Sequence, residues 1–91
     1  MNTVKMNQFG QFLTGRDFGQ KTFKELEAGL AHPVTLDFEG TVSLGSSFGD
    51  EVVPPIARRQ NGKVTILNAN KAVWDCLTRI AAESKIEVVK G

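Results

Sequence analysis

Few side chains in this sequence carry the chemistry of a catalytic or metal site. The chain has one histidine, His32, and one cysteine, Cys76, which are too few for a zinc site of histidine and cysteine ligands. No glycine-rich loop ends in Lys-Ser or Lys-Thr, and no Gly-x-Gly-x-x-Gly is present, so the usual phosphate-binding loops are missing. His32 precedes Pro33 in a predicted loop. Cys76 lies on the apolar side of a predicted helix, where a thiol is a packing group. We expect no catalytic residue, no metal and no cofactor.

Carboxylates are the remaining groups that could transfer protons. Asp37 and Glu39 flank the end of a predicted strand, and Asp50 and Glu51 fall in the first turns of a predicted helix. Carboxylates in such places are usually solvated, or they favour the positive end of the helix dipole. A small enzyme with Asp37 and Asp50 as acid and base is therefore the least favoured reading of the chain. It requires the two groups to converge in one pocket.

The bulk properties are those of an ordinary globular protein. Ninety-one residues make a single domain, residues 1–91, and 41% hydrophobic with 23% charged residues is an average composition. The net charge of +1 gives no reason to expect a nucleic-acid partner, and the basic residues Arg58, Arg59 and Lys63 form too small a cluster for one. No apolar run approaches the roughly 18 residues that span a membrane, and no secretory signal is seen. We expect a cytoplasmic protein without a membrane partner.

The spacing of apolar residues predicts alternating strands and helices. Gly19 on the apolar side of the first helix predicts a close approach of that helix to the sheet. Pro54 and Pro55 lie past the first turn of the second helix, which we expect to be bent or shortened there. The expected strands cover residues 3–6, 11–13, 34–38, 63–67 and 86–89, and the expected helices begin near Asp17, Ser46 and Asn70. The order is ββαβαβαβ, an α/β fold in which about three helices pack on a mixed β-sheet.

One segment carries a resemblance to a known family. Residues 34–52 read Val-Thr-Leu-Asp-Phe-Glu-Gly-Thr-Val-Ser-Leu-Gly-Ser-Ser-Phe-Gly-Asp-Glu-Val, a strand, a tight loop, paired serines and a helix start. This pattern resembles the STAS superfamily of sulphate-transporter and anti-sigma-factor-antagonist domains, and it is closest to the STAS-like branch. The earlier run Leu13-Thr-Gly-Arg-Asp-x-Gly19 is also similar to that branch. The resemblance covers about residues 7–80 and implies a STAS-like fold.

The resemblance also implies a regulatory site. In the antagonist proteins, a partner kinase of the histidine-kinase-ATPase type phosphorylates the first serine of the pair, and the unphosphorylated form binds that partner. Ser46 is the corresponding phosphoacceptor. A phosphate adds about −1.5 to −2 charges, which a helix N-terminus tolerates. The partner-binding or switch loop implied by the resemblance comprises Asp37, Gly45, Ser47, Phe48, Asp50 and Glu51.

The favoured hypothesis is therefore a non-catalytic regulatory domain that binds an anti-sigma regulator of the histidine-kinase ATPase type. The alternative is a sensor of a nucleotide or anion, bound at the N-terminus of the helix that contains Ser47. The two serines also have a simpler reading, in which Ser46 or Ser47 is only an N-cap. Trp74, at the margin of the last helix's apolar stripe, is either an interface anchor or a rim of the core. A homodimer through an uncovered strand edge is compatible with each hypothesis.

Overall fold

The computed structural model describes residues 2–91, and Met1 lies outside the described residues. Four strands form the main sheet and two very short strands form a second one. The chain runs β1 (Asn2–Lys5), a 3-10 turn (Met6–Phe9), β2 (Phe12–Leu13), α1 (Arg16–Glu27), β3 (Val34–Asp37), β4 (Ser43–Leu44), α2 (Ser46–Arg58), β5 (Lys63–Leu67), α3 (Lys71–Ser84) and β6 (Glu87–Lys90). The α/β class with three α helices is as predicted.

The main sheet has the strand order β1-β3-β5-β6, and each neighbouring pair is parallel. The small β2–β4 sheet is parallel too. The predicted mixed sheet is therefore wrong in this detail. Strands β1, β3 and β5 each lead to a helix that returns the chain to the starting edge, so the next main-sheet strand runs in the same direction. The first two expected strands, β1 and β2, belong to different sheets and do not pair with each other.

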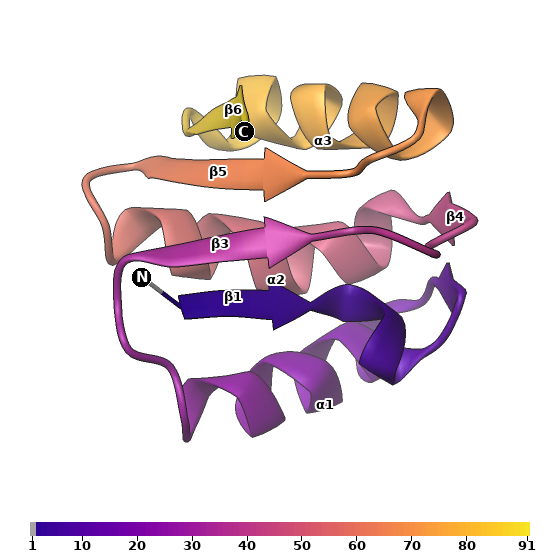
Figure 1. The fold of residues 1–91 in the computed structure, drawn as a ribbon, viewed down its shortest axis with the longest axis horizontal. Coiled ribbons are helices and arrows are strands. Elements are labelled where there is room, and N and C mark those ends of the chain that lie inside the picture. The colour runs from indigo at the N-terminus through magenta and orange to yellow at the C-terminus, as the bar shows by residue number, and fades with distance from the viewer. Residues whose placement is uncertain (1) are drawn as a thin grey trace.

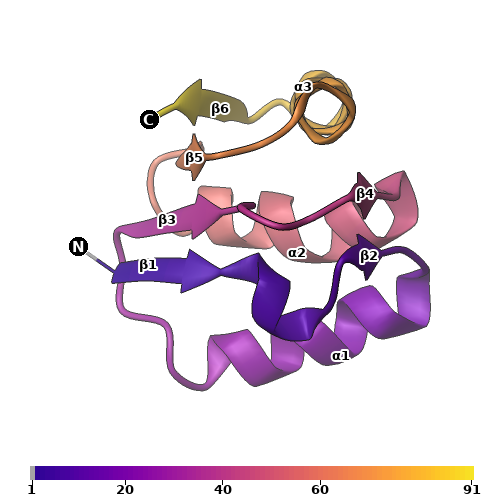
Figure 2. The same ribbon diagram turned by 45° about the vertical axis from the view of Figure 1, so that its right-hand side comes forward.

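All three helices lie on one side of the main sheet (Figures 1 and 2). Right-handed crossovers that step across the sheet in one direction place every helix on the same face. The other face carries no helix of residues 2–91. Strands β1 and β6 form the two edges, and β1 is exposed apart from half-buried Val4. Dimerisation through such an edge stays a prediction.

The hydrophobic core fills the space between the sheet and the helices. Alternate residues of the two central strands face the helices, so Val34, Leu36, Val64 and Ile66 are almost completely buried. The helices contribute Val52, Val53, Ile56, Val73, Leu77 and Ile80 to the same cluster. This burial is the main stabilising term for a chain of this size.

Helix α2 does not end at its prolines. It continues through Pro54 and Pro55 to Arg58, so of the two predicted outcomes the shortening does not occur and the bend stays a prediction. A proline inside a helix removes one backbone hydrogen bond. The burial of Val53, Ile56 and other side chains of α2 compensates for that loss, because packing supplies most of a helix's stability in a folded domain.

Gly19 marks a close helix–helix contact rather than the predicted contact with the sheet. A Cβ atom at this position would lie 2.9 Å from the carbonyl oxygen of Phe48 and 3.0 Å from the Cβ atom of Glu51. Both neighbours belong to α2. Helices α1 and α2 can therefore pack at this distance only if residue 19 has no side chain.

We predict that Gly19→Ala lowers the free energy of unfolding by about 1–3 kcal/mol, because the added methyl group overpacks a contact with backbone atoms. Gly29→Ala is the matched control, since a Cβ at residue 29 meets no atom within 4 Å. Its free energy of unfolding should change by less than about 0.5 kcal/mol. Urea titrations followed by circular dichroism measure both. Equal losses in the two variants would contradict the close packing described here.

Candidate functional site

The candidate site lies at the carboxyl edge of the main sheet, where the parallel strands end and the helices begin. This edge is on the right in Figure 1, beside β2 and β4. The chain leaves β3 at Asp37, passes through β4 and enters α2 at Ser46. Crevices at the carboxyl ends of parallel strands are the usual binding positions in open α/β sheets.

Ser46 is exposed and is the first residue of α2. The N-cap is Gly45, which makes no side-chain capping bond, so the reading of Ser46 or Ser47 as the N-cap is wrong. The first hydrogen bond of the helix runs from the Gly49 N–H to the Gly45 carbonyl oxygen, at 2.9 Å. The N–H groups of residues 46–48 precede that bond and have no intrahelical partner. This helix start is therefore suited to a negative charge on Ser46.

Gly45 is fixed by its contacts with the chain after β2. Its N–H donates to the Leu13 carbonyl oxygen at 2.8 Å. A Cβ atom at residue 45 would lie 3.2 Å from Cγ2 of Thr14. Any side chain at residue 45 would therefore require Thr14 to move. The glycine therefore allows β2 to lie directly against the start of α2.

The other residues of the predicted switch loop point in different directions. Phe48 is only 1% exposed and its ring packs against that of Phe18, with centroids 5.2 Å apart. It is a core residue, so its predicted place on a partner-binding surface is wrong. Ser47 and Asp50 are half-buried. Glu51, also half-buried, forms an ion pair with Arg16 of α1 at 3.7 Å.

Asp37 is 7% exposed and holds the turn that follows β3. Its Oδ1 atom accepts hydrogen bonds from the Asn68 side-chain amide at 3.0 Å and from the Glu39 N–H at 2.9 Å. The hydrogen bond from Asn68 and, to a smaller extent, that from Glu39 lower the pKa of the Asp37 carboxyl. Burial acts to raise this pKa, and the positive charge of Lys5 acts to lower it. Asp37 thus anchors two loops to each other. The use of Asp37 and Asp50 as acid and base stays a prediction.

The negative charge of Asp50 acts on Cys76 of α3. Burial raises the pKa of the Cys76 thiol, the positive charge of Arg79 acts to lower it, and the charge of Asp50 acts to raise it. The thiol is buried and free, which agrees with its predicted role as a packing group. Among the described residues, no group of three or more histidine, cysteine, aspartate and glutamate side chains is placed to hold a metal ion.

Two exposed apolar residues belong to the chain segments that meet at the start of α2, and the sequence did not single them out. Phe12 is 62% exposed and Val42 is 49% exposed. The residues on either side of Phe12 bond to this part of the chain: the Gln11 carbonyl accepts from the Val42 N–H at 2.8 Å, and the Leu13 carbonyl accepts from Gly45. The backbone segments that carry Phe12, Val42 and Ser46 are therefore neighbours, and we call this part of the molecule the Ser46 surface. The sequence could have indicated the exposure of Phe12 through the Phe12-Leu13 pair, because only one of two adjacent strand residues can face the core.

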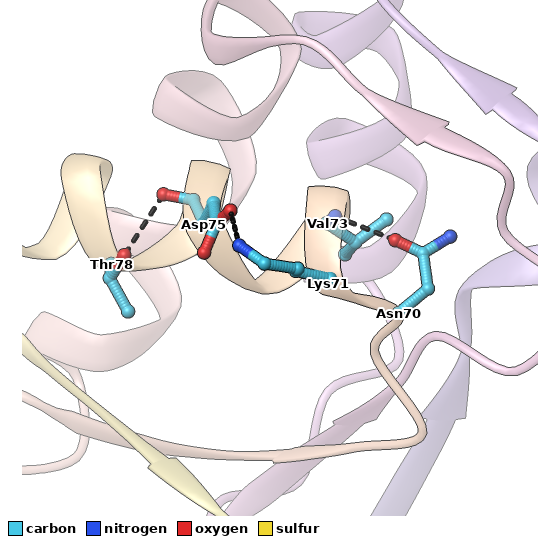
Figure 3. Close-up of polar contacts among 5 residues, drawn as sticks. All are labelled: Asn70, Lys71, Val73, Asp75 and Thr78. Carbon is cyan, nitrogen blue, oxygen red and sulfur yellow. Dashed lines mark hydrogen bonds and ion pairs between the residues drawn. The ribbon is translucent and has the colours of Figure 1, made fainter.

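Asn70 connects this surface to α3. As the N-cap of α3 it accepts a hydrogen bond from the Val73 N–H at 2.8 Å (Figure 3). Its amide nitrogen donates to the carbonyl oxygens of Thr41 and Val42, both at 3.2 Å. One side chain therefore both caps a helix and fixes the loop that presents Val42. The exposed side of the same helix carries a Lys71–Asp75 ion pair at 2.9 Å (Figure 3).

Comparison with protein families assigns the chain. Residues 18–74 match the family described as a STAS-like domain of unknown function (DUF4325), and the matched segment includes α1, β3, α2 and the start of α3. The chain belongs to this STAS-like family, as the Gly45-Ser46-Ser47-Phe48 pattern predicted. Comparisons with curated proteins and with solved structures gave no match. Within residues 2–91, no helix has the length and apolar character needed to cross a bilayer.

We predict different outcomes for two substitutions of Asn70. Asn70→Ala removes the cap, which costs about 0.5–2 kcal/mol, and also removes both bonds to the loop. Asn70→Asp keeps an acceptor for the Val73 N–H but has no amide donor for the loop carbonyls. Amide hydrogen exchange should show faster exchange at Val73 in Asn70→Ala only. Loss of protection at Val73 in both variants would contradict the separate roles.

We predict that the stabilising contribution of Asp37 depends on pH. Its pKa is lowered in the folded protein from an ordinary value of 3.8. The contribution is therefore complete above that value and is lost as the pH falls through the folded-state pKa. Asp37→Asn should lower the free energy of unfolding by about 1–3 kcal/mol at pH 7, and the difference from wild type should shrink in acid. A difference that is constant from neutral to acid pH would show that the Asp37 charge is not involved.

Proposed function

We propose that this domain is a non-catalytic regulatory module that binds a protein partner through the Ser46 surface. The observation that carries the proposal is the exposed position of Ser46, at a helix start without a side-chain cap, on a segment whose backbone neighbours carry the exposed Phe12 and Val42. A large exposed aromatic side chain is typical of an interface anchor. The resemblance to anti-sigma-factor antagonists favours an ATP-binding regulator of the histidine-kinase type as the partner.

The same surface suits a switch by phosphorylation. A phosphate on Ser46 would carry about −1.5 to −2 charges on the surface that a partner must cover. Docking would then have to remove water from that charge, which is costly unless the partner offers a positive group. The fold itself would accept the modification, because the start of α2 has free N–H groups. Phosphorylation would therefore change the partner's affinity without unfolding the domain.

Binding experiments on variants of the Ser46 surface test this proposal. The first step is capture from the native host's lysate with wild-type protein, identification of a retained protein with an ATP-binding domain, and its purification. Calorimetry then compares Ser46→Asp and Ser46→Ala. We predict at least about tenfold weaker binding for Ser46→Asp and near-wild-type binding for Ser46→Ala.

Two further variants separate the surface from general charge effects. Thr78→Asp adds the same charge at an exposed position of α3 and should bind like wild type. Phe12→Ala removes an exposed apolar group without a change of charge, and it should weaken binding while leaving the unfolding midpoint in place. Equal affinities for wild type, Ser46→Asp and Phe12→Ala would remove the Ser46 surface as the docking site.

A further inference from the structure

A second feature of the carboxyl edge has no part in the Ser46 surface. A pocket of about 200 Å³ opens where β5 and β6 end and the chain turns into α3. It is lined by Ile66, Asn68, Ala69, Trp74, Lys90 and Gly91. None of these residues belongs to the Ser46 surface.

The lining combines an aromatic face with a positive charge. The Lys90 ammonium lies 5.1 Å from the centre of the Trp74 ring, and Trp74 is half-buried. Ile66, which is almost completely buried, adds an apolar contact. The side-chain amide of Asn68 is held in place by its hydrogen bond to Asp37. The backbone of Asn68 is in the left-handed region, with a φ of 57°. The pocket therefore offers a flat apolar surface, one cation and a fixed amide.

We propose that this pocket binds a planar aromatic anion, with the ring against Trp74 and the acidic group paired with Lys90. A ring on the indole face would displace the ammonium from its cation–π contact. The ammonium then needs a new partner, which an acidic group on the ligand supplies through a charge-assisted hydrogen bond. The nearby start of α3, a helix of 14 residues, favours the same sign of charge. An aliphatic anion would not use the indole, and a neutral ring would leave Lys90 unpaired.

The pocket's size limits the ligand. Sites for drug-sized ligands have volumes of about 300–1,000 Å³, so this pocket takes a single or fused ring and leaves the rest of a larger ligand in solvent. Aromatic carboxylates and nucleoside monophosphates share the required chemistry. The two sources differ in the geometry of the acid and in the ring, so separate probes distinguish them.

Trp74 gives a direct readout, because the chain has one tryptophan and no tyrosine. Tryptophan emission of the full chain is titrated with benzoate and AMP as aromatic anions. Benzyl alcohol and adenosine are the neutral rings, and acetate and phosphate are the anions without a ring. We expect saturable quenching by benzoate or AMP, and at least about tenfold weaker binding of the other four probes. No saturable change with benzoate or AMP, or equal binding of the neutral rings, would overturn the proposal.

Two lysine variants test the role assigned to Lys90. Lys90→Met should remove the preference for the aromatic anion over its neutral counterpart, whereas Lys71→Met should keep it, because Lys71 is paired with Asp75 and does not line the pocket. Thermal unfolding confirms that both variants are folded. A preference that survives in Lys90→Met would contradict the assignment. Ser46→Asp should bind the ring anion as wild type does, so this test is independent of partner binding.

Discussion

Parallel strands taken in sequential order constrain everything else in this domain. Each connection from a main-sheet strand to a helix must occur at the same edge, and each helix must lie on the same face. The start of α2 with Ser46 and the start of α3 with Asn70 are brought to one edge in this way. The topology of the sheet alone therefore brings Ser46 and Asn70, which are distant in sequence, to the same edge.

Polar side chains then hold the loops at that edge in one arrangement. Asp37 joins the end of β3 to Asn68 after β5, and Asn70 joins the start of α3 to the loop before β4. Each of these side chains bonds to two different segments, so the loops support one another. A binding surface on such loops needs little ordering when a ligand or partner arrives, which lowers the entropic cost of binding.

The sequence predicted the parts of the fold that depend on local pattern. The alternation in residues 63–67 predicts β5 with its observed bounds, and the helix start predicted near Asn70 agrees with the start of α3 at Lys71. Strand direction could not be predicted this way, because parallel pairing depends on crossovers between distant segments. Phe48 was placed on the switch loop by resemblance, although its spacing to Val52 and Ile56 is that of a buried helix face. The exposure of Phe12 and the Trp74–Lys90 pair depend on tertiary contacts, which no spacing rule contains.

The one-sided sheet also creates a gradient of local stability. The central strands β3 and β5 each have two neighbours and bury their apolar side chains, whereas β1 is an edge strand with only Val4 partly buried. Local opening starts where few apolar contacts hold the chain, which in this sheet is at β1. Met6, which follows β1 directly, and Leu13, which follows Phe12, are both completely buried, so an opening of β1 ends before it reaches Phe12. The Ser46 surface is thus separated by buried side chains from the edge strand that opens most easily.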